Sequence, residues 1–331
     1  MPEAPPGGPG EFETIAELFR PLAHGAPEAL DLRDDAAVLS PRPGEDLVVT
    51  ADAVVEGVHF LPDDPLDLVA RKLLRVNLSD LAAKAAEPFA YLLTIAWSPR
   101  CGWAERRAFA AGLAADQAAF GVRLIGGDTV STPGPLTAGV TAFGRVPTGR
   151  AVLRGGARPG DRLFVSGAVG DGLLGLRAVR GELDLPDEAV AALADRYRLP
   201  RPRLTLRAAL RTHARAAIDV SDGLIADVGH LAAASGLAAA IDLDALPLSA
   251  PARAWLTRQS RETALVELVT GGDDYEIVCA VAPEQADAFR AAAEAAGTPV
   301  TEIGRVVAGE GVRVTFDGRP LRIDRPGWRH G

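Results

Sequence analysis

The sequence predicts a mixed α/β protein built from two domains. Short apolar runs bounded by turn residues alternate with longer segments of helical spacing, an alternation typical of the α/β class. At 331 residues the chain exceeds the size at which a single core usually stops growing. Pro and Gly cluster between Pro147 and Pro159. We therefore predict a disordered Pro/Gly-rich tail over residues 1–11, a first domain over 12–147 and a second over 148–331.

The first domain is predicted to run β-β-α-β-α-β-β. In its first helix Leu74, Leu78 and Leu81 recur at helical spacing, and its second helix is rich in alanine. The two helices are expected to stop before Pro88 and at Gly121. The expected elements are strands at Ala36–Leu39 and Leu47–Ala51, a helix at Leu66–Ala86, a strand at Tyr91–Trp97, a helix at Trp103–Phe120, and strands at Val122–Ile125 and Thr137–Val146.

The second domain is predicted to begin with a strand and to continue as an alternation of helices and strands. Buried strands are expected where apolar runs are short and rich in β-branched residues. These strands lie at Arg162–Ser166, Ala216–Val220, Ala238–Leu243, Tyr275–Val281, Glu302–Val307 and Val312–Phe316. Helices are expected near Leu173–Arg180, Glu188–Arg196, Arg203–His213 and Pro283–Ala296. The result is a C-terminal α/β domain.

Composition excludes several classes of protein. The net charge is −9 and no block rich in Lys or Arg stands out, which argues against a nucleic-acid surface. No apolar run approaches the length that spans a membrane, and the first residues lack the features of a signal peptide. Cys101 and Cys279 lack the paired spacing of zinc or redox motifs. We expect a cytoplasmic protein that binds neither nucleic acid nor membrane.

Four acidic clusters are the most informative feature of the chain. They lie at Arg33–Ala36, Asn77–Asp80, Gly126–Thr129 and Asp219–Gly223, at the ends of apolar stretches or inside amphipathic ones. An unpaired carboxylate is costly to bury in such surroundings. Mg²⁺ takes only oxygen ligands and is usually held by a few carboxylates together with substrate phosphates. The clusters therefore predict a metal and phosphate site.

Each cluster also has a purely structural interpretation. Asp34 and Asp35 are typical turn residues, and Asp52 can begin an Asx-turn after its strand. Asp80 can pair with Lys84 one helical turn later. Gly126–Asp128 can form a tight turn, and Asp222 can cap the helix that begins near Leu224. Only Asp219, which interrupts a strand, has no such role. The joint occurrence of the clusters favours one shared site.

A glycine-rich motif offers a competing function. Gly170–Gly175, read G-D-G-L-L-G, fits the G-x-G-x-x-G fingerprint of dinucleotide-binding folds and follows a predicted strand. No carboxylate ends a second strand at the required distance. A glycine-rich turn that opens a helix, near a phosphate, is the preferred interpretation. The P-loop motif G-x-x-x-x-G-K-[ST] is absent from the sequence.

Taken together, the motifs resemble the thiamine-monophosphate kinase family, within the ATP-binding superfamily of aminoimidazole ribonucleotide (AIR) synthetase. The similar segments follow the family's order from about Phe12 to Trp328. They are Asp34–Ala36, Thr50–Asp52, Gly57–Phe60, Val76–Ala83, Ile125–Thr129, Gly149–Arg154, Ile218–Leu224, Gly271–Glu276 and Gly327–Trp328. The resemblance implies a two-domain AIR synthetase-like fold whose N-terminal domains pair into a dimeric barrel-like sheet.

The resemblance also implies roles for individual residues. The positions that match Mg²⁺ ligands are Asp35, Thr50, Ala51 through its backbone, Asp52, Asp80, Asp128, Asp219 and Asp222. Those that match ATP contacts are Gly127, Asp128, Arg154 and Ser221. Those that match contacts to thiamine monophosphate are His59, Asp273 and Trp328, the indole stacking on a cationic ring. The residues expected to act in catalysis are Asp35, Asp80, Asp128 and Arg154.

The implied reaction is ATP-dependent phosphorylation of thiamine monophosphate to thiamine diphosphate by a homodimer. The attacking phosphate oxygen is already anionic near neutral pH, so no catalytic base is required and direct in-line transfer is expected. Three positions depart from the family pattern. Arg33 replaces a usual Gly, Ala51 a common Thr, and Asp273 a usual Glu.

Two alternative functions stay open from the sequence. A purine-pathway ligase shares the architecture but activates an amide oxygen, and its substrate would separate it from a kinase. Selenophosphate synthesis and hydrogenase maturation are disfavoured, because no cysteine lies near the N-terminus and the chain ends Trp328–Gly331 without one. The second alternative is a non-catalytic nucleotide- or metal-binding module, which would bind ATP without turnover.

Overall fold

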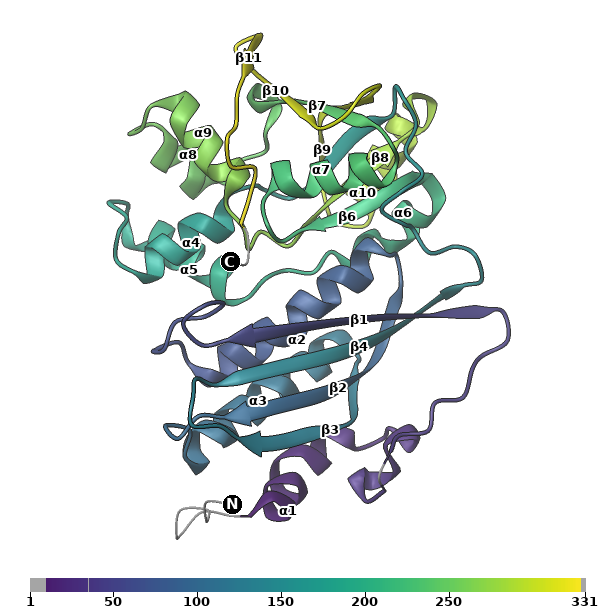
Figure 1. Cartoon of the computed structure of the whole chain (residues 1–331), viewed down its shortest axis with the longest axis vertical. Coiled ribbons are helices and arrows are strands. Elements are labelled where there is room, and N and C mark those ends of the chain that lie inside the picture. The colour runs from purple at the N-terminus through teal and green to yellow at the C-terminus, as the bar shows by residue number, and fades with distance from the viewer. Residues whose placement is uncertain (1–9, 35, 329–331) are drawn as a thin grey trace. The chain divides into compact units, whose positions relative to one another are not determined.

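The chain folds into two compact units, each with its own sheet. The computed structural model describes residues 10–34 and 36–328 (Figure 1). Unit 1 comprises the chain up to residue 81 together with residues 87–149, and unit 2 comprises residues 82–86 and the chain from residue 150 onward. The expected mixed α/β fold class is confirmed. None of the helices in the described part of the chain is both long and apolar enough to cross a membrane.

Unit 1 is built on a four-stranded sheet in the order β1-β4-β2-β3, with β2 and β3 parallel and the other pairs antiparallel. The rings of Trp97 and Phe109 meet edge to face, with centroids 5.5 Å apart, and fasten α3 to the sheet. Figure 1 shows α2 and α3 on the same face. The bounds are β1 (Glu45–Val55), α2 (Leu66–Ala83), β2 (Glu87–Trp97), α3 (Trp103–Phe120), β3 (Arg123–Ser131) and β4 (Thr137–Pro147).

The start of unit 1 differs from the prediction. Short helical turns, for which no element was predicted, precede the sheet: α1 (Glu11–Thr14), η1 (Ile15–Phe19), η2 (Arg20–Ala23) and η3 (Pro27–Leu32). The strand predicted at Ala36–Leu39 is wrong, since these described residues lie outside every strand of the sheet. The Val38 N–H bonds the Glu28 carbonyl instead, at 2.9 Å. Pro41 and Pro43 follow and carry no backbone N–H, so this part of the chain cannot donate at these positions the hydrogen bonds of a β-sheet.

Unit 2 contains a seven-stranded mixed sheet in the order β11-β10-β7-β9-β5-β8-β6. Its strands are β5 (Arg162–Ser166), β6 (Ala214–Val220), β7 (Ala238–Asp242), β8 (Glu276–Val281), β9 (Val300–Val307), β10 (Val312–Phe316) and β11 (Arg319–Leu321). Its helices are α4 (Asp171–Val179), α5 (Asp187–Arg198), α6 (Arg207–His213), α7 (Leu224–Ala234), α8 (Ala250–Leu256), α9 (Arg261–Thr270) and α10 (Ala286–Ala295), with the short turns η4 (Leu204–Leu206), η5 (Leu243–Ala245) and η6 (Pro283–Gln285).

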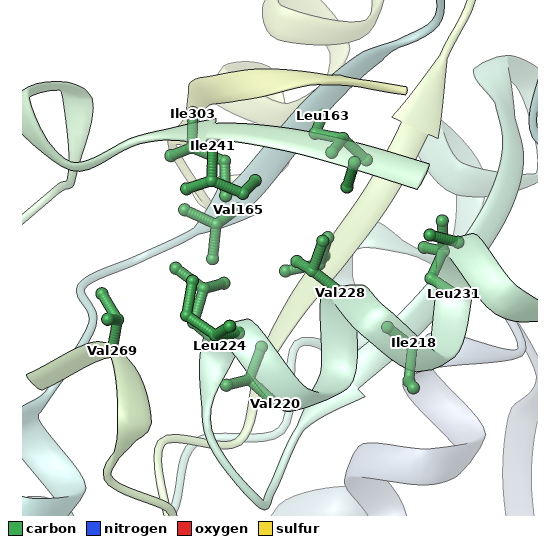
Figure 2. Close-up of a cluster of buried hydrophobic side chains, with 14 of the residues drawn as sticks. Leu163, Val165, Ile218, Val220, Leu224, Val228, Leu231, Ile241, Val269 and Ile303 are labelled. Carbon is green, nitrogen blue, oxygen red and sulfur yellow. The ribbon is translucent and has the colours of Figure 1, made fainter. Parts of the chain in front are cut away.

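The main core of unit 2 lies between α7 and the sheet. Figure 2 shows Leu224, Val228 and Leu231 of α7 turned toward aliphatic side chains of the strands, including Val165 and Ile241. All five are nearly inaccessible to solvent, and burial of each such side chain stabilises the fold by about 1.5–3 kcal/mol. This packing fixes the start of α7, and with it the Asp219–Gly223 loop that enters the helix.

Candidate active site

In unit 1, three of the predicted metal positions come together on β1 and α2. The Thr50 hydroxyl donates to Asp80 Oδ2 at 2.5 Å. One helical turn earlier, Asn77 Oδ1 accepts the backbone N–H of Asp52 at 2.9 Å. These bonds hold the two elements in register, bring the Thr50 hydroxyl to the Asp80 carboxylate and fix the backbone of Asp52 beside α2. Such an all-oxygen set suits a hard divalent cation. Asp35 lies outside the described residues.

The glycine-rich cluster of unit 1 lies inside a strand and not in the turn that was predicted as its structural alternative. Gly126, Gly127 and Asp128 all belong to β3, where the pairing with β2 shifts by one residue at Leu92. A Cβ on Gly127 would lie only 1.8 Å from the Leu93 carbonyl oxygen, and its φ is 151°. Glycine is therefore required for β3 to pass this irregularity.

We predict that Gly127→Ala destabilises the protein by about 3 kcal/mol, because its Cβ must displace backbone in a paired strand. Gly139→Ala is the matched control in the same sheet, where the nearest atom to a new Cβ is 3.7 Å away. Urea unfolding followed by circular dichroism measures the two differences. Equal stability of the two variants would show that the close approach at Gly127 is absent.

Asp128 does not meet the Thr50–Asp52–Asp80 group within one chain. The strand registers align Ala53 with Gly139, Gly139 with Thr94, and Thr94 with Asp128. Three strand spacings, about 14 Å, therefore separate the backbones near Asp52 and Asp128. Ligand oxygens lie about 2.1 Å from Mg²⁺, so these two residues of one chain are too far apart to share an ion.

A cavity of about 920 Å³ in unit 1 brings two of the acidic clusters together. Its lining includes Arg33 and Asp34 from the first cluster and Gly127 and Asp128 from the third. The Arg33 side chain, which departs from the family pattern, thus borders the same space as Asp128 and offers a cation there. Phe12, Phe19 and Phe143 make much of the remaining wall apolar.

His59 is held in one tautomer by its own loop. The Val55 N–H donates to His59 Nδ1 at 3.0 Å, so this nitrogen is an acceptor and the neutral ring carries its proton on Nε2. The buried ammonium group of Lys72 donates to the His59 carbonyl at 3.0 Å. Asp64 accepts the Leu61 N–H at 2.8 Å. The loop therefore fixes the orientation of the His59 ring through Nδ1.

In unit 2 the Asp219–Gly223 cluster forms a tight loop between β6 and α7. Asp219 is buried near the end of β6, where it pairs with Ile277. The sequence-based alternative that Asp222 caps α7 is wrong. Asp227, one turn into the helix, accepts the N–H groups of Ser221, Asp222 and Gly223 at 3.0–3.2 Å. The N-cap residue of α7 is Gly223, so Asp222 does not occupy the capping position.

Asp227 belongs to a group that sequence reasoning missed. Oxygen or nitrogen atoms of Asp222, Asp227 and His230 all lie within 4.8 Å of one another. Burial, followed by the charge of Asp222, raises the pKa of Asp227 from 3.8 to about 7, although its three backbone hydrogen bonds act in the opposite direction. The signal in the sequence is the spacing of S-D-G-x-x-x-D, which places the second carboxylate over the loop.

The raised pKa of Asp227 predicts a pH dependence of stability in the metal-free protein. Between about pH 4 and about pH 7, the Asp227 carboxyl group is protonated in the native state and ionised in the unfolded state. Its contribution to the free energy of unfolding is therefore fully present below about pH 4 and is lost as the pH rises to about 7. The slope is at most about 1.4 kcal/mol per pH unit. Asp274, whose pKa burial raises to about 8, acts in the same direction.

Asp227→Asn should therefore flatten part of the decline in unfolding free energy between pH 4.5 and 7.5. Urea titrations of wild type and variant at several pH values in EDTA measure this difference. Glu310→Gln on the exposed turn before β10 is the control and should leave the wild-type slope unchanged. Parallel pH profiles for wild type and Asp227→Asn would contradict the assignment.

The predicted substrate residues of unit 2 lie beside the Ser221–Gly223 loop. The Asp273 N–H donates to the Ser221 carbonyl and the Trp328 N–H to the Asp222 carbonyl, both at 2.9 Å. The Tyr275 hydroxyl donates to Asp273 Oδ1 at 3.2 Å. Asp273 and Trp328 are thus fixed through backbone bonds to the segment that carries the predicted ATP and metal positions. Arg154 is exposed in the loop before β5.

A cavity of about 650 Å³ opens beside this junction within unit 2. Asp222, His230 and Trp328 line it together with aliphatic residues of α7 and β10. Trp328 is 58% exposed where it borders this cavity. A lining that combines a carboxylate, an indole ring and aliphatic side chains suits a heteroaromatic molecule that carries a positive charge.

The G-D-G-L-L-G motif does not leave its N–H groups open to a phosphate. Gly170 precedes α4 with a φ of 88°, and its N–H donates to Asp274 Oδ2 at 2.7 Å. The Gly172 N–H donates to Asp274 Oδ1 at 2.9 Å. The expectation of a glycine-rich turn that opens a helix is confirmed, but the acceptor at its first turn is the Asp274 carboxyl group of the protein itself.

Comparison with known proteins identifies both halves of the chain. Residues 33–146 match the AIR synthase related protein N-terminal domain, and residues 158–317 match the C-terminal domain of the same family. A thiamine-monophosphate kinase of Caulobacter vibrioides is 57% identical over 324 residues, covering 98% of this chain and 91% of the relative. The thiamine-monophosphate kinase of Salmonella typhimurium is 40% identical, covering 97% and 98%.

Solved structures show the same likeness. The crystal structure of thiamine-monophosphate kinase from Stenotrophomonas maltophilia K279a has a TM-score of 0.82 and 39% identity, covering 93% of this chain and 97% of that one. AaThiL complexed with AMPPCP and TMP has a TM-score of 0.78 and 29% identity, covering 88% and 89%. The hydrogenase maturation protein HypE of E. coli, at 22% identity and a TM-score of 0.76, shares the fold.

Proposed function

The chain belongs to the thiamine-monophosphate kinase family, with both AIR synthase-related domains, and from this premise we propose that it transfers the γ-phosphoryl group of ATP to thiamine monophosphate. The observation that carries the proposal is the junction in unit 2, where Asp273 and Trp328 are bonded to the backbone of Ser221 and Asp222. A relative of the same fold, AaThiL, is known in complex with AMPPCP and TMP. We place the reaction in the cytoplasm.

The residues of the chain account for the demands of this reaction. Two phosphorylated anions must approach each other, so the main obstacle is their repulsion. The oxygen ligands of Thr50, Asp52 and Asp80 in unit 1, and of Asp219 and Asp222 in unit 2, would hold Mg²⁺, with the Ala51 carbonyl as a further donor. When bound, Mg²⁺ would neutralise and orient the phosphates. Arg154 would supply an additional, exposed cation, and His59 a hydrogen-bond donor.

We infer direct in-line transfer without a phosphoenzyme. The acceptor phosphate is anionic near neutral pH and attacks without a general base. The test uses ATP that is chiral at the γ-phosphorus. Inversion of configuration in thiamine diphosphate is the expected result, whereas overall retention would require a phosphorylated intermediate and would overturn this step.

A substrate panel separates this function from its alternatives. Purified protein is incubated with ATP and Mg²⁺ and with either thiamine monophosphate or a formylglycinamidine ribonucleotide. Only the thiamine compound is expected to raise ADP release above background. Turnover of the amide substrate would indicate a ligase of the same architecture, and ATP binding without turnover would indicate a non-catalytic module.

We further propose a homodimer in which β1 of one copy pairs with β3 of the other. Both are outer strands of the sheet of unit 1 and carry half-exposed aliphatic residues: Leu47 (52%) and Val49 (51%) on β1, and Val130 (47%) on β3. Exposed strand edges of this kind readily pair with another chain. Such pairing would close two four-stranded sheets into a barrel and would remove the gap between Asp52 and an Asp128.

A further inference from the structure

The loop Gly271–Tyr275 is held in a strained conformation that its own residues do not favour. Asp273 has a φ of 69° and Tyr275 a φ of 50°, in the left-handed region that residues with a side chain rarely adopt. Asp274 lies between them and is 1% exposed. Strain of this kind persists only where the surrounding structure imposes it, and it concentrates at functional sites.

The Asp274 carboxylate is the main restraint on this loop. Its two oxygens accept the N–H groups of Gly170 and Gly172, at 2.7 and 2.9 Å, so it spans the first turn of α4. Because one carboxyl group accepts two backbone N–H groups, it ties the loop to the start of α4 at two points. The buried guanidinium group of Arg196 also donates to the Asp274 carbonyl, at 3.3 Å.

Glycines allow the three segments to pack at this distance. A Cβ on Gly172 would lie 2.4 Å from the carbonyl carbon and oxygen of Asp273. A Cβ on Gly272 would lie 2.5 Å from the Ser221 carbonyl oxygen. Backbone bonds from Asp273 to Ser221 and from Tyr275 to Val220 complete the attachment. The start of α4, the Gly271–Tyr275 loop and the Ser221–Gly223 loop thus form one rigid junction.

We propose that Asp274 is a positioning residue for substrate binding, which fixes Asp273 against thiamine monophosphate by anchoring its loop to the G-D-G turn. This inference rests on the proposed function, because it takes Asp273 as a contact to that substrate. It assigns a role to the G-D-G-L-L-G motif, which receives the carboxylate of the protein and not a phosphate. Asp274 itself is buried and acts through Asp273.

The test is the steady-state kinetics of Asp274→Asn. An amide keeps the shape but can accept only one of the two N–H bonds, so the loop loses part of its anchor. We expect the KM for thiamine monophosphate to rise about tenfold, since a displaced contact of 1 Å costs this much or more, while the KM for ATP changes less than about twofold. Gly172→Ala, which changes no charge, should give the same pattern and serves if Asp274→Asn does not fold.

The control is Asp161→Asn, another buried carboxylate of unit 2 that accepts a backbone N–H, from Arg158 at 2.8 Å, and an Arg215 guanidinium. It should lose stability without a change in KM. A double-mutant cycle adds Asp273→Ala: if Asp274 acts through Asp273, then Asp274→Asn should cause no further rise in KM in that background.

Three results would overturn the inference. The first is an unchanged KM for thiamine monophosphate in both folded variants. The second is an equal rise in the KM for both substrates, which indicates general disruption. The third is full additivity in the cycle. If the wild-type protein does not turn over thiamine monophosphate at all, the proposed function fails, and the inference about this substrate fails with it. If the wild type is active and the variants are unaffected, only the inference fails.

Discussion

Replacing Asp80 with asparagine is expected to lower kcat by about a thousandfold while the protein stays folded. The carboxylate lies within hydrogen-bond distance of Thr50, beside the Asp52 backbone that Asn77 anchors. An amide can still accept the Thr50 hydroxyl, so α2 and β1 should remain in place. What is lost is one negative charge in an oxygen ligand set that would otherwise hold a divalent cation against the phosphates.

The measurement compares kcat for Asp80→Asn with kcat for Asp67→Asn, a carboxylate in the first turn of the same helix. Thermal unfolding of both variants checks the fold. We also expect a higher concentration of Mg²⁺ to be needed for half-maximal rate in Asp80→Asn. A variant that retains more than a tenth of the wild-type kcat would remove Asp80 from the site.

Mixing two inactive variants is expected to restore activity. If β1 of one copy pairs with β3 of the other, each site takes Asp52 from one subunit and Asp128 from the second. A mixed dimer of Asp52→Asn and Asp128→Asn then has one site with both changes and one with neither. After random exchange of subunits, about a quarter of the wild-type activity should return.

The control for this experiment is a mixture of Asp52→Asn with Asp80→Asn. These two positions lie on β1 and α2 of the same unit and contribute to a site from the same subunit. In their mixed dimers one site carries Asp52→Asn and the other carries Asp80→Asn. Neither site is intact, so activity should stay at background. Recovery in this control, or none with Asp52→Asn and Asp128→Asn, would contradict the pairing of β1 with β3.

Much of the fold could be predicted from local pattern. Helices α2 and α3 and strands β5, β8 and β10 follow from apolar periodicity, because burial on one face or on both decides these elements. The segment Ala36–Leu39 has a strand-like composition but a different partner, and that partner is set by the unexpected helical turns near Glu28. Helices α8 and α9 were not predicted, since their segment carries mixed signals from Pro, Ser and Arg.

The candidate site, too, could be predicted from the sequence only in part. The acidic clusters indicated a metal and phosphate site from residue chemistry alone, whereas the roles of Thr50 and Trp328 depended on family resemblance. Asp227 and Asp274 were missed as functional residues because they do not belong to the predicted ligand set. They support loops of the site by accepting backbone N–H groups. The support from Asp227 is local and could have been found in the S-D-G-x-x-x-D spacing. The support from Asp274 could not, because it depends on the packing of its loop against the start of α4, about a hundred residues earlier in the chain.

The central claim is that this protein moves the γ-phosphoryl group of ATP onto thiamine monophosphate. The most direct measurement follows [γ-³²P]ATP, with Mg²⁺ and thiamine monophosphate, by chromatography of the products. We predict that the label appears in thiamine diphosphate, with one ADP formed for each molecule. Release of the label as inorganic phosphate while thiamine monophosphate remains unchanged would contradict the account.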